Sequence, residues 1–141
     1  MTRGEAVKRL IMNLRGDLAR YEAFGDLLEK QLLAALSHDG VEMSRINAEV
    51  LVLAETLSVN LKARRVLAAS IVGGDGPATI GDVLAKLSAA PREVLSRESQ
   101  RFAECVERCK RLNERNAELI VSQQEILQRV FQKGDDLYAP N

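Results

Sequence analysis

The sequence predicts an all-α protein, an elongated antiparallel helical bundle or coiled coil of three long helices plus one short helix. Apolar residues recur at alternating steps of three and four along most of the chain, which is the spacing of a helix with one buried stripe. The apolar content comes from Leu, Val, Ile and Ala, whereas aromatic residues make up 4% of the chain and Trp is absent. No segment alternates apolar and polar residues as a half-buried strand would.

The first two predicted helices span residues 3–36 and 41–72. In the first, apolar residues keep the heptad spacing, and Gly25 on the stripe permits another backbone to approach closely. In the second, Asn60 and Arg64 interrupt the stripe before it resumes. Because the Ser-His-Asp-Gly turn between the two helices is short, we expect them to be antiparallel neighbours.

The rest of the chain is predicted to form one short helix, one long helix and a flexible tail. These segments cover residues 80–88, 92–133 and 134–141, within a single helical domain that spans 1–141. Thr79 followed by Asp82 is a partial capping box for the short helix. Pro91 suits the first turn of the last helix, and Gly134 supplies a stop signal at its end.

Composition and charge exclude several classes of function. The chain carries 20 basic and 20 acidic residues, so its formal net charge is zero. Such a balance gives no electrostatic signature for nucleic acid or for an anionic membrane surface. No apolar run is long enough to cross a bilayer, and the N-terminus lacks the apolar core of a signal peptide. We therefore expect a cytoplasmic protein that neither binds nucleic acid nor inserts into membranes.

The residues that could carry catalysis or bind a metal do not form a recognisable site. Cys105 and Cys109 lie one helical turn apart, but zinc sites need more ligands and His38 is the single histidine. We interpret both cysteines as small core residues. The glycine-rich segment 72–80 lacks the Lys-Ser/Thr of a phosphate-binding loop, and no nucleophile elbow is present. We expect no enzyme activity, no cofactor and no metal.

The C-terminal part of the last predicted helix is the candidate partner surface. Between residues 119 and 131 only Glu125 and Arg129 are charged. The apolar residues there fall on adjacent lines of the helix surface and form a face more than about 100° wide. Either the first two helices or a partner helix must cover such a face. The predicted partner-binding residues on it are Leu119, Ile120, Ile126, Leu127, Val130 and Phe131.

Two asparagines, Asn113 and Asn116, lie on or beside the same stripe. Amides on an apolar stripe reduce stability when unpaired, but they fix the register of helices when paired. Asn116 lies inside the stripe, which favours a role in alignment with the first two helices. Asn113 lies at the edge, which favours contact with a partner. Both are included among the predicted partner-binding residues, because either amide can instead form hydrogen bonds with the backbone of a partner.

The run 113–116, Asn-Glu-Arg-Asn, followed by Leu119 and Ile120, resembles the signature of FlgN-type flagellar export chaperones. In that family a late helix carries two asparagines three residues apart, followed by an apolar pair. The basic cluster 62–65, Lys-Ala-Arg-Arg, and the tail 137–141, Leu-Tyr-Ala-Pro-Asn, are also similar to the family. The predicted order of two long helices, a short helix and a long last helix agrees as well.

This resemblance implies a bacterial cytosolic type III secretion chaperone without ATPase activity. It would bind the C-terminal amphipathic segments of hook–filament junction proteins of the FlgK and FlgL type and prevent their premature aggregation or assembly. It would then deliver them to the flagellar export gate, where Tyr138 is the candidate residue for docking to the cytosolic domain of the gate. The alternative is a structural coiled-coil adaptor without an export client, a homodimer formed through the C-terminal helix.

Overall fold

The computed structural model describes the backbone of residues 1–138 and the side chains of residues 1–122 and 125. Within this part of the chain the backbone forms four helices and no strands. In chain order they are α1 Arg3–Leu36, α2 Gly40–Val72, α3 Ile80–Leu84 and α4 Ala89–Tyr138. The predicted fold class, all-α with three long helices and a short one, is confirmed.

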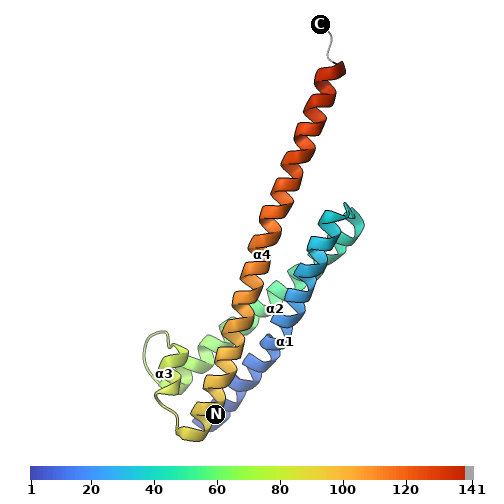
Figure 1. Ribbon diagram of the computed structural model, residues 1–141. Helices are drawn as coiled ribbons and strands as arrows, with labels where there is room; N and C mark the ends of the chain where they lie inside the picture. Colours follow the sequence, from blue (N-terminus) through green and yellow to red (C-terminus); the bar gives the residue numbers. More distant parts are fainter. Residues whose placement is uncertain (139–141) are drawn as a thin grey trace.

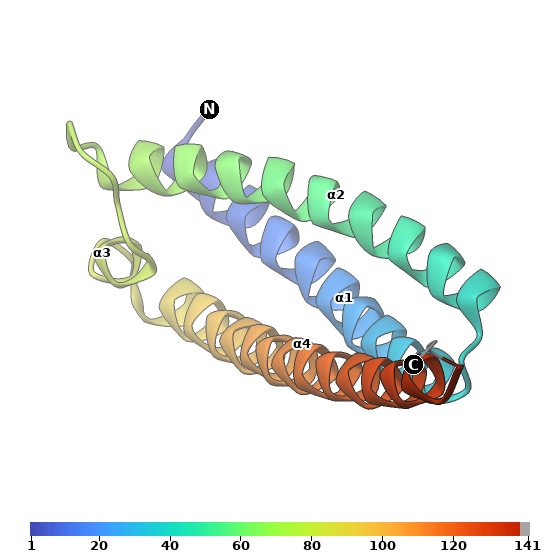
Figure 2. The same ribbon diagram turned by 90° about the horizontal axis from the view of Figure 1, so that it is seen from above.

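α1 is the central helix and packs against both of the other long helices (Figures 1 and 2). α2 returns antiparallel to α1, and α4 runs in the same direction as α1 on its other side. Within the described residues, no Cα atom of α2 lies within 8 Å of a Cα atom of α4. The two outer helices are therefore joined through α1 and, at one end, through α3.

Local capping explains where the first two helices begin. The Thr2 hydroxyl accepts a hydrogen bond from the Glu5 backbone N–H at 3.2 Å, and the Glu5 carboxylate accepts one from the Thr2 N–H at 3.1 Å. This reciprocal capping box satisfies two donors that an uncapped helix leaves unpaired. At the start of α2, the Asp39 carboxylate accepts from the Glu42 N–H at 3.1 Å. Both helices consequently begin within one residue of their predicted positions.

α2 ends at a glycine in the left-handed conformation. Gly73 has φ 74° and its N–H donates to the carbonyl of Ala69 at 2.9 Å. A Cβ atom is disfavoured in this backbone conformation. Gly73→Ala is therefore expected to lower the free energy of unfolding by about 1 kcal/mol, measured by urea denaturation.

A neighbouring glycine supplies the control for that prediction. Gly74 does not have a positive φ angle, and no heavy atom lies within 4 Å of a Cβ atom built on it. Gly74→Ala is expected to leave stability nearly unchanged. Equal losses from the two alanine variants would contradict the assignment of the cost to the left-handed conformation of Gly73.

α3 begins at the predicted capping box and ends earlier than predicted. The Thr79 N–H donates to the Asp82 carboxylate at 2.9 Å, and the Asp82 N–H donates to the Thr79 hydroxyl at 3.1 Å. The bond from the Thr79 N–H is the main reason that the pKa of Asp82 is lowered. After Leu84 the α-helical hydrogen-bonding pattern is lost, because the N–H groups of Lys86 and Leu87 donate to the carbonyls three residues earlier in the chain. The predicted helix 80–88 is thus a five-residue helix followed by a turn.

α4 is longer than predicted at both ends. It starts at Ala89, with Pro91 inside the first turn, where helical N–H groups have no partner within the helix. At the other end the helix passes through Gly134 and reaches Tyr138, so the predicted end at Lys133 is wrong. A single glycine costs about 1 kcal/mol relative to alanine, and the helix continues through it here. Of the predicted flexible tail, residues 139–141 lie outside the described part of the chain.

The core has two parts at different positions along α1. The larger lies where α1, α2, α3 and α4 meet, and the smaller lies between α1 and α2 near their connecting turn. The larger cluster consists of Ala6, Val7, Leu10, Leu14, Ala68, Ile71, Val83, Leu87 and Leu95. The smaller consists of Leu27, Ala34 and Ile46. The short helix α3 thus anchors the ends of the long helices, since Val83 is fully buried.

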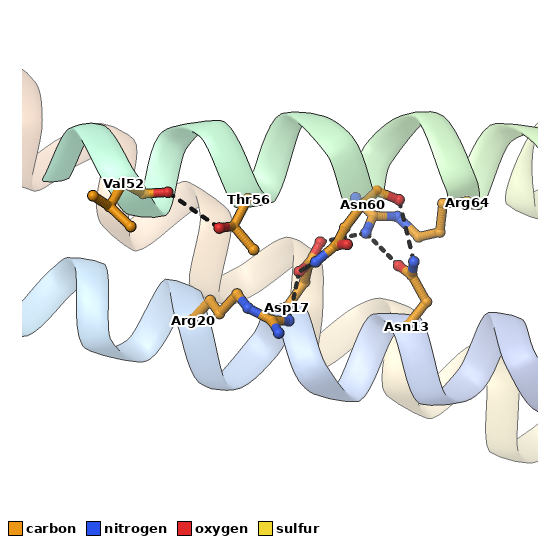
Figure 3. A network of polar contacts seen from close by, with 7 residues as sticks. All are labelled: Asn13, Asp17, Arg20, Val52, Thr56, Asn60 and Arg64. Carbon is orange, nitrogen blue, oxygen red and sulfur yellow. Dashed lines mark hydrogen bonds and ion pairs between the residues drawn. The ribbon is translucent and has the colours of Figure 1, made fainter. Parts of the chain in front are cut away.

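A buried polar network joins α1 to α2 between the two parts of the core (Figure 3). The Arg64 guanidinium donates to the Asp17 carboxylate at 2.6 Å and to the Asn13 amide oxygen at 2.7 Å. The Asn60 amide donates to Asp17 at 2.8 Å, and Arg20 donates to it at 3.1 Å. Asn60 and Arg64, the two polar residues that interrupt the apolar stripe of α2, are therefore hydrogen-bonded to polar side chains of α1.

α1 and α4 run side by side in one fixed register. The Cys109 thiol donates to the Tyr21 carbonyl at 3.1 Å, and the Asn116 amide donates to the Leu28 carbonyl at 2.7 Å. Both pairs are separated by 88 residues. Because the sequence separation is the same at both contacts, the register between α1 and α4 is constant from one contact to the other.

This register leaves the last part of α4 beyond the rest of the molecule. With the same separation of 88 residues, Leu36 at the end of α1 lies level with Gln124 of α4. The α4 backbone continues to Tyr138, which adds roughly 20 Å at about 1.5 Å per residue. Figure 1 shows this end of α4 projecting past the turn between α1 and α2.

Candidate partner-binding groove

An open groove lies between α2 and α4, with α1 as its floor. It forms because α1 holds the two outer helices apart, and its volume is about 500 Å³. Its apolar lining comes from all three long helices. These lining residues are Tyr21 and Phe24 of α1, Ala54, Leu57 and Leu61 of α2, and Phe102, Val106 and Cys109 of α4.

The floor of the groove is an aromatic cluster. The Tyr21 and Phe102 rings meet edge to face, with centroids 5.4 Å apart, and the Phe24 ring centroid lies 6.4 Å from that of Tyr21. The Arg64 guanidinium carbon lies 4.8 Å from the Phe102 ring centroid, within range of a cation–π interaction. Burial is the main reason that the pKa of Tyr21 is raised. Arg64 therefore connects the α1–α2 network with α4 at the end of the groove.

The rim of the groove is mixed in character. Leu61 on the α2 side is 38% exposed, and Lys110 and Asn113 on the α4 side are exposed. An apolar floor with polar groups at one edge matches the requirements of an amphipathic helix, which buries one stripe and keeps its flanks in water. Asn113 lies at the edge of the groove.

Asn116 lies in the α1–α4 interface instead of the groove. Its side chain is 1% exposed, and its amide donates to the Leu28 carbonyl at 2.7 Å and to the Gln31 side chain at 3.0 Å. Its amide oxygen accepts from Arg115 at 3.1 and 3.2 Å, and Arg115 also pairs with Glu29 of α1. These bonds are the ones expected of a residue that aligns two helices, and they leave Asn116 no surface for a partner in this conformation.

The remaining predicted partner-binding residues lie farther along α4. Ile120 is half-buried and Leu119 is 41% exposed. The other predicted residues fall where the structure describes the α4 backbone but not the side chains. They are Ile126, Leu127, Val130, Phe131 and, for gate docking, Tyr138.

Cys109 and Gly25 lie where α4 packs on α1, and Cys105 is half-buried. Cys109 is buried, and burial raises the pKa of its thiol to about 11. The absence of a side chain at Gly25 makes room for the guanidinium of Arg108. The sequence predicted that another backbone would approach Gly25 closely, but the group that does so is this side chain. Among the described residues, no group of three or more His, Cys, Asp or Glu side chains could hold a metal ion.

The α2 side of the groove was missed by sequence reasoning. Leu61 and Ala54 lie beside the stripe that faces α1, and a single-stripe interpretation treats them as surface residues. The available signal was that α2 carries apolar residues around most of its circumference. A helix of this kind is buried on more than one side or carries an interaction surface.

Comparison with known proteins gives the family. The family model described as FlgN protein matches residues 1–133, which include α1, α2, α3 and the asparagine pair of α4. No curated protein and no solved structure matched the chain. Within the described residues, no helix has the length and apolar character needed to span a bilayer. The chain therefore belongs to the FlgN family of flagellar export chaperones.

Proposed function

We propose that this chaperone binds the C-terminal amphipathic segments of hook–filament junction proteins of the FlgK and FlgL type in the bacterial cytoplasm. It keeps these segments from aggregating or assembling early and delivers them to the flagellar type III export gate. The observation that carries the proposal is the open groove between α2 and α4, an apolar channel on a chain of an export-chaperone family. A client helix in this groove would add a fourth long helix and cover its aromatic floor.

The projecting part of α4 extends the proposed site. A client helix that lies along the α4 side of the groove passes Asn113 first and Ile120 next. Beyond Gln124 the α4 backbone has no α1 residue level with it, so a client could occupy that side of the helix. We propose that Leu119 and, beyond Gln124, Ile126, Leu127, Val130 and Phe131 continue the contact. Asn113 donates to or accepts from the client backbone at the groove rim.

Calorimetric titration of the full chain with C-terminal peptides of junction proteins tests the proposal. Tight one-to-one binding is expected for the unmodified chain. Leu61→Asp places a carboxylate on the apolar wall and is expected to weaken binding at least about 100-fold, since an unpaired charge would be buried under the client. An Ile126→Asp, Leu127→Asp double variant tests the projecting part of α4 in the same way.

Leu33→Asp is the matched control for the groove variant. Leu33 is 64% exposed on α1 and does not line the groove, so the same chemical change should leave peptide affinity unaltered. A well-folded chain that binds no junction peptide would reject the proposed client and favour the structural adaptor. Equal losses from Leu33→Asp and Leu61→Asp would reject the groove as the site.

Delivery to the export gate is proposed to use Tyr138. The α4 backbone reaches this residue at the far end of the projecting segment, away from the core. A tyrosine there can bury an aromatic ring on a partner and keep its hydroxyl hydrated. Tyr138→Ala should weaken binding to the cytosolic domain of the gate and leave peptide titrations unchanged. Unaltered binding to that domain would reject the docking role.

A further inference from the structure

A second pocket lies at the end of the molecule where α1 and α4 begin, opposite the projecting end of α4 (Figure 1). Its volume is about 610 Å³, and its lining comes from the start of α1, the turn after α3 and the start of α4. We call it the basic pocket. It is defined by three basic residues, Arg3, Lys8 and Lys86, and three apolar ones, Ile11, Pro91 and Val94.

The apolar part of the basic pocket is incompletely covered. Ile11, Pro91 and Val94 are half-buried, whereas the core residues Val7 and Leu87, which also line the pocket, are buried. Covering such partly exposed apolar surface is favourable. Because these atoms line a concave site, the side chains that cover them must come from a partner that enters it.

All the charged residues that line the basic pocket are positive. Arg3, Lys8 and Lys86 are exposed, and none of them takes part in the ion pairs formed by the described residues. The lining given by these residues contains no Asp or Glu. The three charges are therefore available to an anionic partner.

The surrounding chain has the same bias toward positive charge. Residues 1–15 contain four basic residues and one acidic residue, Glu5, whose carboxylate is bonded at the start of α1. Glu93, the first acidic residue of α4, does not line the pocket, and the first turn of α4 contains no acidic residue. The partial positive charge of this helix end adds to that of the side chains. The zero net charge of the whole chain thus conceals a positive potential at this end.

We propose that the basic pocket binds an acidic amphipathic segment of a second protein, distinct from the client. The apolar side chains of the segment enter the pocket and cover Ile11, Pro91 and Val94. Its carboxylates pair with the three basic residues at the rim, which give charge-assisted hydrogen bonds. The arrangement follows the general mode in which an amphipathic segment buries one stripe and keeps its charged flanks in water.

The lining favours a peptide over other anionic partners. Proteins that bind single-stranded nucleic acid stack its bases on aromatic side chains, and no aromatic residue is among the described residues that line the basic pocket. A membrane surface is bound by apolar side chains that project into it, whereas the apolar side chains here line a concave site. Charge and shape together are therefore complementary to an acidic peptide.

The basic pocket is separate from the groove between α2 and α4. The two sites share no lining residue. On α1 the pocket extends as far as Ile11, and the groove begins with Tyr21, about 15 Å farther along the helix. A chain with a client in the groove therefore keeps the pocket accessible. The inference depends neither on the groove nor on the identity of the client.

Fluorescence anisotropy of labelled synthetic peptides, titrated with the full chain at about 50 mM salt, tests the proposal. The probe is a peptide of roughly 15 residues, or about four helical turns, with a leucine stripe flanked by glutamates. Two comparison peptides replace its glutamates with lysines or its leucines with serines. The probe is expected to bind at least about tenfold more tightly than either, because the pocket requires negative charge and apolar surface together.

Charge reversal in the pocket should change the preference for the peptides. Lys8→Glu and Lys86→Glu are each expected to weaken binding of the probe about tenfold and to strengthen binding of the lysine peptide, a gain that misfolding would not produce. Lys62→Glu is the matched control, since Lys62 is exposed on α2 and does not line the pocket. Leu61→Asp, which alters the groove, should leave probe affinity unaltered.

Several results would overturn the proposal. Equal affinities for the three peptides, or an equal loss in Lys62→Glu, would indicate a general effect of charge. Loss of probe binding in Leu61→Asp would place the probe in the groove, and loss of junction-peptide binding in Lys86→Glu would make the pocket part of the client site. A single-stranded RNA of about 12 nucleotides, or vesicles with about 30% phosphatidylglycerol, that bound through Lys86 while the probe did not would identify another class of partner.

Discussion

Arg64→Met is expected to lower the free energy of unfolding by about 3–5 kcal/mol. The Asp17 carboxylate is 0% exposed, and Arg64 donates to it at 2.6 Å. Without the guanidinium, Asp17 keeps its bonds from Asn60 and Arg20 but loses its buried counter-charge. The one cation that then remains, Arg20, is partly exposed, so most of the cost of burying the Asp17 carboxylate is no longer compensated. Urea denaturation followed by circular dichroism measures the loss.

A second replacement distinguishes a buried charge from lost packing. Adding Asp17→Leu to Arg64→Met removes both ions and fills the site with apolar atoms, so part of the lost stability is expected to return, although Asn13 and Asn60 lose a bonding partner each. Arg45→Met is the control on the same helix, because the pairs that Arg45 makes with Glu42 and Glu49 are exposed and its loss should matter little. A double variant as unstable as Arg64→Met alone would contradict this account.

The helices were largely predictable, because their signals are local. Apolar spacing, the turn before α2 and the Thr79–Asp82 capping box depend on residues close together in sequence. The ends of α4 were less predictable. Proline and glycine signal helix ends only on average, and α4 includes both Pro91 and Gly134.

The partners of the buried network were not predictable in the same way. Arg64 and Asn60 were visible as breaks in a stripe, but their partner Asp17 looks like an ordinary surface charge of another helix. The groove also depends on three helices at once. The apolar pattern of each helix shows which side is buried, but it does not show how far α1 holds α2 and α4 apart.

Asn116→Ala is expected to lower the free energy of unfolding by about 2–3 kcal/mol, the second largest effect of a single substitution. The change removes two donated bonds to α1 and leaves a small cavity at a position that is 1% exposed. It also takes away the acceptor of two bonds from Arg115. Asn113→Ala, at the exposed groove rim, should instead leave stability nearly unchanged and weaken junction-peptide binding.

Asn116→Leu separates the hydrogen bonds from the volume of the side chain. Leucine fills the space but donates no bond, so the Gln31 oxygen loses its partner from α4 and part of the destabilisation should persist. Urea denaturation of the three variants provides the comparison. If Asn116→Leu were as stable as the unmodified chain, the amide would not hold the register between α1 and α4. Because both walls of the groove are set by α1, a loosened register should also weaken peptide binding in Asn116→Ala, although Asn116 does not line the groove.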